Sequence, residues 1–440
     1  MSALEKNRFV LSLAILALAT LAIFAPALVF GATGGILFIA LVFHSPTFGI
    51  LAAILASVFG EFGRIEVAGI SFLILDLVAP AVFGIWLLRK FTRKEKIILD
   101  GVSSSLLVFW AIGFLSLIFA SEELAGEELK FAFLHFLRFV GISGMLLVAR
   151  DCGRKEAAGI LNSLLFAGFL LAISGFILLR VFPDFAAAGL TEAGWDPHVG
   201  RLASTFFDPN FTGGVFAFLL AILGGKFLRE QKFAKQVFLI AIAGILGIAL
   251  FLTFSRSALL ALGFSGLILG IFGSRKILLA MLAVGILGMS ISPRLAERVG
   301  EFTQSMESIS GESQQILDPT AQLRVDSWQE GWRIWRENPF LGVGFGAYKF
   351  QQTFSSEDSH AATGSDASLL NVGATTGFLG FGIFGILLWN LAAASFRKKE
   401  WGFLAALGGI LVHSIFVNSL FFPPLALYFF VSAGLAVSEK

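Results

Sequence analysis

The chain has little charge and almost no cysteine, and each shortage excludes a class of protein. Only 14% of its 440 residues are charged, whereas soluble domains carry about 25%, so the chain is not a soluble protein. The single cysteine, Cys152, excludes an intrachain disulfide and a cysteine metal cluster. The five histidines are scattered without paired spacing, so we expect no metal site. We also find no internal repeat.

Long apolar runs fill most of the chain. Hydrophobic residues make up 57% of it, and the mean hydropathy is +0.86. Runs of about 20 apolar residues recur from end to end, and each can cross a bilayer core as a helix. They predict an all-α, polytopic transmembrane bundle with about 14 spans, the first of them retained rather than cleaved as a signal peptide. We place the spans at 9–30, 31–43, 46–60, 67–88, 105–120, 131–149, 156–181, 210–228, 235–253, 257–273, 276–292, 367–396, 402–420 and 423–437.

One long polar stretch divides the chain into three parts. Residues 1–292 hold the first eleven predicted spans, residues 293–366 form the polar loop, and residues 367–440 hold the last three spans. Within the loop, Pro319 to Asn338 predicts an amphipathic helix with three tryptophans on one face: Trp328, Trp332 and Trp335. Two interpretations stay open: an interfacial helix resting in the lipid headgroups through this face, or a mobile lid over a groove for a lipid substrate.

Lysine and arginine gather in alternate connections, and this alternation indicates the topology. Short loops rich in these residues stay cytoplasmic, as expected for Arg89–Lys96 and Arg397–Lys399. Both termini are then cytoplasmic, and 31–60 crosses the membrane twice with a turn at His44-Ser45-Pro46. The loop 182–209, the Ser255-Arg256-Ser257 link and the long polar loop share the outer face, and all three carry arginine.

Arginines on that outer face are candidates for binding a diphosphate. Arg201 precedes the eighth predicted span, Arg256 sits between two apolar runs, and Arg324 lies in the long loop. A guanidinium grips phosphate oxygens in a bidentate fork and can stabilise charge on a phosphate leaving group. The alternative is that each arginine snorkels to the membrane surface. Supporting polar residues lie beside them in the sequence: Asp208, Asn210 and Ser255.

Asp366 and His360 are the candidate general bases. Both precede the span that opens at Ser368, on the outer face and near the arginine-bearing loops. A carboxylate or an imidazole there can take the proton from a sugar hydroxyl. The alternatives are that Asp366 is a helix N-cap and that His360 is a solvated loop residue.

Other polar residues within the apolar runs have structural explanations. Asp76 and Arg138 lie in different spans, and buried intramembrane charges are usually paired, so we expect them to pair with each other. His135 is one helical turn from Arg138 and belongs to the same polar patch. His413 and Asn418 are expected to face a polar interior rather than a metal.

Four stretches of the chain resemble motifs of one enzyme superfamily. They are Arg201 through Asp208-Pro209-Asn210; Thr253-Phe254-Ser255-Arg256-Ser257-Ala258, similar to a Ser-Arg-Gly motif; Asn338-Pro339-Phe340-Leu341-Gly342-Val343-Gly344-Phe345-Gly346, similar to an NPxxGxG segment; and Asp366 through Thr376-Gly377-Phe378-Leu379-Gly380, similar to HNxYL…EhGhhG, with h apolar. These motifs follow one another around one large outer loop, and in this order the chain resembles the O-antigen ligase and polymerase superfamily.

The resemblance implies an inverting, metal-independent glycosyltransferase of the bacterial inner membrane. Such an enzyme moves a glycan from an undecaprenyl-diphosphate carrier to a glycan or glycolipid acceptor at the periplasmic face, in lipopolysaccharide or polysaccharide biosynthesis. Arg201 and Arg256 match the family's diphosphate-binding arginines. We expect the membrane lipid as a partner, no cofactor and no nucleic acid.

The fourth motif departs from the ligase pattern. Asp366-Ala367 stands where ligases have His-Asn, and Thr375 stands where the family has a glutamate. Polymerase-like members of the family often carry aspartate at the first position. The departure therefore favours a polymerase-like or divergent transferase over a lipopolysaccharide core ligase.

Two other functions stay open at this point. A transporter or flippase of a lipid-linked or anionic substrate would have broken helices at the bilayer midplane and an internal repeat. A substrate site that opens alternately to the two faces of the membrane would favour the transporter or flippase. A catalytically inactive scaffold for a glycan-assembling complex is the other possibility, and a glycan-transfer assay on purified protein separates it from an enzyme.

Overall fold

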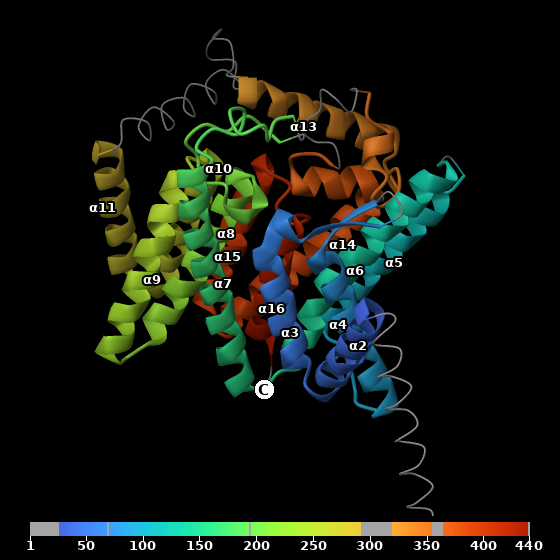
Figure 1. Cartoon of the computed structure of the whole chain (residues 1–440), viewed down its shortest axis with the longest axis horizontal. Coiled ribbons are helices and arrows are strands. Elements are labelled where there is room, and N and C mark those ends of the chain that lie inside the picture. The colour runs from blue at the N-terminus through green and yellow to red at the C-terminus, as the bar shows by residue number, and fades with distance from the viewer. Residues whose placement is uncertain are drawn as a thin grey trace, which may run out of the picture.

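The chain is a bundle of helices, as its composition predicts. The computed structural model describes residues 26–67, 70–122, 124–192, 195–291, 319–353 and 364–438. Figure 1 shows most helices side by side, with α13 lying across one end of the bundle. The helices are α2 Pro26–His44, α3 Pro46–Phe59, α4 Ile74–Thr92, α5 Gly101–Ala120, α6 Gly126–Arg150, α7 Arg154–Val181, α8 Pro209–Arg229, α9 Phe233–Leu252, α10 Arg256–Ile268, α11 Arg275–Ile291, α13 Pro319–Glu337, α14 Ser368–Arg397, α15 Trp401–Phe416 and α16 Pro423–Val437.

Short elements complete the described chain. They are the strands β1 Arg64–Val67 and β2 Ile70–Leu73, the 3-10 turns η1 Gly60–Gly63, η2 Ser204–Phe206 and η4 Tyr348–Phe350, and the π-helical turn η3 Leu269–Gly273 that extends α10. Within the described ranges, eight helical segments are long and apolar enough to cross a membrane. The total of about 14 spans stays a prediction.

The predicted turn between the second and third spans is present. α2 ends at His44, and α3 begins at Pro46 with Ser45 as its N-cap. Proline suits the first helical position because its missing N–H needs no partner there. The boundary predicted near residue 30 is wrong, because α2 runs without a break from Pro26 to His44.

Two further span boundaries need correction. The span predicted at 67–88 begins only at Ile74, because residues 64–73 form an antiparallel hairpin of β1 and β2. Polar and apolar residues alternate in Arg64–Val67, which matches the period of a strand. The apolar sequence around these four residues hides this signal. The span predicted at 402–420 ends at Phe416, so Asn418 lies in the α15–α16 connection.

The predicted pairing of buried charges is confirmed, with one change in place. Arg138 Nη1 of α6 lies 3.5 Å from Asp76 Oδ2 of α4. Asp76 is not in the middle of a span, because it lies in the first turn of α4 and also accepts a hydrogen bond from the Leu73 amide. The pair therefore anchors the start of α4 to α6.

The cationic connections meet at the end of the bundle opposite α13. Arg229 after α8 donates to the Lys399 carbonyl and pairs with Glu400 before α15. Ser438 donates to the Arg150 carbonyl at the end of α6, and Figure 1 shows the C-terminus at this end. These contacts join the ends of α6, α8 and α15 to the C-terminal segment at one end of the bundle.

The third and fourth motifs form one backbone junction. Gly342 and Gly377 have φ of +68° and +64°, and each lies against the other motif's backbone: Gly342 on Thr375–Thr376, Gly377 on Phe340–Leu341. The Phe378 amide donates to the Pro339 carbonyl at 2.7 Å. These contacts interrupt α14 with a kink at Gly377 and fix where the loop after α13 meets α14.

A side chain from α5 closes this junction. The hydroxyl of Ser116 lies 2.6 Å from the Leu341 carbonyl and 2.7 Å from the Thr375 carbonyl. It therefore contacts both motifs at once. The kink of α14 leaves backbone carbonyls without helical hydrogen-bond donors, and the Ser116 hydroxyl supplies part of the missing hydrogen bonding inside the protein.

We predict that Gly342→Ala destabilises the protein strongly. A methyl group there meets backbone atoms that cannot move aside, and the left-handed conformation adds strain. Together these cost about 2–5 kcal/mol, measurable as a lower thermal unfolding midpoint of the purified protein. Gly382→Ala in α14 is the matched control, because a methyl group there has open space. Equal midpoints for the two variants would contradict this account of the junction.

Candidate functional site

Arg201 joins the segment before α8 to the turn between α9 and α10. Its Nε donates to the Thr253 carbonyl at 2.9 Å, and its Nη2 donates to Asn210 Oδ1 at 3.1 Å. The next residue, Leu202, donates its amide to the Leu252 carbonyl at 2.8 Å. The guanidinium is thus held between two segments about 50 residues apart, rather than left to snorkel alone.

Asn210 brings the second arginine motif to the same place. Ser255 Oγ donates to Asn210 Oδ1 at 3.0 Å, so this single oxygen accepts from both Arg201 and Ser255. Ser255 is the N-cap of α10, and Arg256 is its first residue. Asp208 caps α8 by accepting from the amides of Asn210 and Phe211. The Arg201 side chain therefore meets the N-terminal turns of α8 and α10, with Arg256 next to Ser255 in the sequence, an arrangement that favours an anion.

The turns that carry these residues are strained. Ser204, Phe207 and Phe254 have φ of 52°, 53° and 49°, in the left-handed region that non-glycine residues rarely adopt. Only two other non-glycine residues of the described chain, Lys94 and Lys399, share this conformation. Such strain persists where surrounding contacts hold it, often at functional sites.

Helix α13 forms at the predicted residues and covers this end of the bundle. Trp335 is buried, with its ring centroid 4.9 Å from Phe381 and 5.0 Å from Phe378 of α14. Trp328 lies 6.0 Å from Phe416 of α15. The interpretation that this face rests in lipid headgroups is therefore wrong for these two rings, because they pack on the protein. Only Trp332 of the three is exposed.

His413 of α15 is buried beside the first turns of α8. Its ring has a hydrogen bond with the Asn210 backbone and lies within electrostatic range of Arg324 of α13. The ring packs on Gly214, one turn along α8 from Asn210. His413 thus faces a polar interior, as predicted, next to the Arg201–Asn210 contact.

Asp366 lies where the start of α14 meets α13. Its amide donates to Ser327 Oγ of α13 at 3.0 Å. The N-cap interpretation of Asp366 is wrong, because Ala367 is the N-cap of α14 and no side chain caps this helix. Burial raises the pKa of Tyr348 far above its usual range, and the nearby carboxylates of Glu330 and Asp366 add to the effect. The other candidate base, His360, lies outside the described residues.

Asp196, His198 and Asp208 form a donor set that sequence spacing did not reveal. Their ligand atoms lie within 4.8 Å of one another. The residues come from one loop and one helix cap, so no short motif marks them. We assign no ion to the set, because Asp208 already caps α8 and His198 packs edge-on against Phe185.

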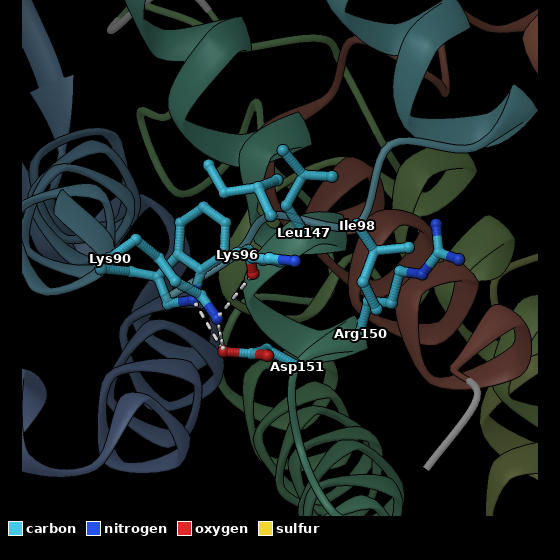
Figure 2. Close-up of a pocket in the computed structure, with 8 residues that line it drawn as sticks. Lys90, Lys96, Ile98, Leu147, Arg150 and Asp151 are labelled. Atoms are coloured by element: carbon cyan, nitrogen blue, oxygen red, sulfur yellow. Dashed lines mark hydrogen bonds and ion pairs between the residues drawn. The ribbon is translucent and has the colours of Figure 1, made fainter. Parts of the chain in front are cut away.

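A pocket at the opposite end of the bundle, shown in Figure 2, is also basic. Lys90 lies 2.7 Å from Asp151, and Arg150 donates to both carboxylate oxygens of Asp100. Burial acts to raise the pKa of Asp100, but the Arg150 and Ser103 hydrogen bonds lower it to about 2. The cations are neutralised locally, so this pocket ties α4, α5 and α6 together rather than offering an anion site.

Glu330 anchors α13 to the segment after it. Its carboxylate accepts from Arg333 at 2.9 and 3.0 Å and from the Thr353 amide at 2.7 Å. Hydrogen bonds from Arg333 outweigh the opposing effect of burial and lower the pKa of Glu330. A lowered pKa in the folded state means that this stabilisation is present above the ordinary glutamate pKa and is lost as the pH falls through the lowered one.

We predict that Glu330→Gln loosens α13 at pH 7. The loss of a charged acceptor costs about 1–3 kcal/mol, seen as faster amide hydrogen exchange in residues 348–353. The difference from wild type should shrink only as the pH falls below the ordinary glutamate pKa and through the lowered pKa of Glu330, where the wild-type carboxylate also becomes protonated. Glu337→Gln is the control, because Glu337 is exposed and bonds the same arginine, so its effect should be small. Equal exchange in all three proteins would contradict this role.

Comparison with known proteins gives one family match. Residues 240–385 match the family model Wzy_C, described as O-antigen ligase. The match includes the Ser255-Arg256 turn, α13 and the junction of the third and fourth motifs. No curated protein matches the chain. This match over residues 240–385 confirms the resemblance to the O-antigen ligase superfamily, and the long apolar helices indicate a membrane protein.

Proposed function

We propose that the protein transfers a glycan from an undecaprenyl-diphosphate carrier to an acceptor hydroxyl, as an O-antigen ligase or polymerase. One observation carries the proposal: Asn210 Oδ1 accepts from both Arg201 and Ser255, beside Arg256. Neither arginine motif alone distinguishes a phosphate site from a surface cation. Their convergence at two helix N-termini supports an anion site.

Arg201 and Arg256 are the proposed diphosphate ligands. Guanidinium groups bind phosphate oxygens through paired N–H donors. They would stabilise the negative charge that grows as the diphosphate leaves, and so take the part that a metal ion has in other transferases. Arg324 is the proposed third cation, since its charge reaches the His413–Asn210 contact from α13.

Asp366 is the proposed base, with His360 as the second candidate. The acceptor oxygen attacks the anomeric carbon and gives its proton to the carboxylate, while the bond from that carbon to the diphosphate oxygen breaks. The diphosphate leaves with the electron pair, and a single displacement inverts the carbon. The position of Asp366 beside Ser327 of α13, at the start of α14, supports this role.

We further propose that the site faces the periplasm and that both termini are cytoplasmic. In this topology residues 1–292 and 367–440 supply about 14 spans, and residues 293–366 form the outer loop. The gathering of cationic connections at the end opposite α13 supports it. The acceptor, a glycan or a glycolipid, would approach from the same periplasmic side.

We predict that Arg201→Ala and Arg256→Ala each lower glycan transfer at least about 100-fold, the usual effect of removing a charge-stabilising donor. Both variants should still insert into membranes, and both should lose affinity for undecaprenyl diphosphate. Arg336→Ala is the control, because Arg336 is exposed on α13. Near-normal product from both site variants would refute the diphosphate role.

We predict a different pattern for Asp366→Asn. The amide cannot accept the proton, so transfer should fall by about 100-fold or more, but undecaprenyl diphosphate should bind as tightly as to wild type. The pair of measurements separates loss of the base from loss of the arginine site. If Asp366→Asn transfers normally and His360→Gln does not, the base is His360.

A further inference from the structure

Two buried polar side chains and one half-buried one, next to the arginine site, remain without an assigned role. Asn371 in α14, His413 in α15 and Asn418 in the α15–α16 connection form what we call the amide–imidazole cluster. Asn371 is 6% exposed and His413 is 1% exposed. Buried amides and imidazoles are normally hydrogen-bonded, so a cluster of them inside a membrane protein indicates a polar ligand or a structural network.

Contacts across three segments hold the cluster together. A methyl group on Gly364 would lie 2.7 Å from Asn371 Oδ1 and 2.8 Å from Asn418 Nδ2, so both amides meet at this glycine. Ser419, next to Asn418, lies 2.5 Å from His413 Nδ1. The Leu420 amide donates to Ser368 Oγ at 3.2 Å, which ties the same connection to α14.

The cluster is not a closed structural network. None of the described residues hydrogen-bonds to Asn371 Oδ1 or Asn418 Oδ1, although both atoms are buried. A buried polar atom without a partner costs about 1–3 kcal/mol. A ligand that supplies hydroxyl donors would recover this free energy on binding.

The histidine holds the cluster beside the arginine site. Its Nδ1 lies against Ser419 Oγ, and its ring also has a hydrogen bond with the Asn210 backbone. The acceptors that the cluster offers are therefore the two amide oxygens of Asn371 and Asn418. Uncharged acceptors suit sugar hydroxyls, which can donate a proton, rather than an ionised phosphate, which cannot.

The cluster adjoins the proposed diphosphate site directly. The His413 ring lies beside the Asn210 backbone, and Asn210 is the residue whose side chain accepts from Arg201. In a lipid-linked glycan the first sugar is bonded to the diphosphate, so it must occupy the space next to the phosphates. The polyprenyl chain is bonded to the other phosphate, but it has no polar group that could bind the two amides.

We propose that the amide–imidazole cluster is the subsite for the first sugar of the donor, the one bonded to the carrier diphosphate. Asn371 and Asn418 would accept hydrogen bonds from its ring hydroxyls through Oδ1 and donate through Nδ2, and His413 would hold this part of the cluster beside Asn210. The subsite rests on the proposed function and extends it, because it gives the protein selectivity for a sugar-bearing carrier over the bare carrier.

Two probes separate the subsite from the diphosphate site. Full-length protein in lipid nanodiscs is titrated with undecaprenyl diphosphate and with undecaprenyl diphosphate carrying one N-acetylglucosamine. Wild type should bind the sugar-bearing probe about tenfold more tightly or better, the effect of one or more recovered hydrogen bonds. Asn371→Leu and Asn418→Ala should lose most of this preference and still bind the bare carrier normally. Asn390→Ala is the control, because Asn390 lies in the same helix but bonds the Gly101 carbonyl at 2.9 Å.

Each other outcome is decisive. If wild type and both cluster variants prefer the sugar-bearing probe over the bare carrier equally, the subsite proposal is wrong. It is also wrong if the cluster variants change only the KM for the acceptor. If wild type binds neither probe, the proposed function fails and the subsite with it. If Arg256→Ala loses both probes and Asn371→Leu changes neither, the diphosphate site stands and the subsite does not.

Discussion

The arrangement of the site depends on one side-chain oxygen. Asn210 Oδ1 accepts from Arg201 of the segment before α8 and from Ser255 at the start of α10. Together with the bonds from Arg201 to the Thr253 carbonyl and from Leu202 to the Leu252 carbonyl, this shared acceptor joins two arginine-bearing turns against the mutual repulsion of their charges. Asn210 and Ser255 lie at the N-termini of α8 and α10, and the positive end of a helix attracts an anion.

A second junction places the other half of the site. Gly342 and Gly377 let the loop after α13 and the kink of α14 approach backbone to backbone, with Ser116 bonded to both. This contact fixes the end of α13 relative to the start of α14, and the Glu330 anchor and Ser327 hold the rest of the helix. The glycine-rich motifs of the sequence therefore have a packing role, while the polar residues around them are available for chemistry.

Local sequence patterns predicted where the helices lie in the chain better than they predicted which helices contact each other. The bundle, the break before Pro46, the helix at Pro319 and the start of α8 follow from apolar length and proline position. The hairpin before α4 was hidden because its strands are short and its surroundings apolar. The packing of Trp335 on α14 and the meeting of Asn371 with Asn418 depend on contacts between distant segments, which periodicity cannot reveal. The arginines were identifiable individually, but the shared acceptor was not.

The central claim is that Arg201 and Arg256 bind one diphosphate between them. The most direct measurement is an electron cryo-microscopy structure of the full-length protein with undecaprenyl diphosphate. The account predicts phosphate density in contact with both guanidinium groups, beneath α13 and next to Asn210. Phosphate density elsewhere, for example at the Lys90 pocket of the opposite end, or in contact with neither arginine, would contradict it.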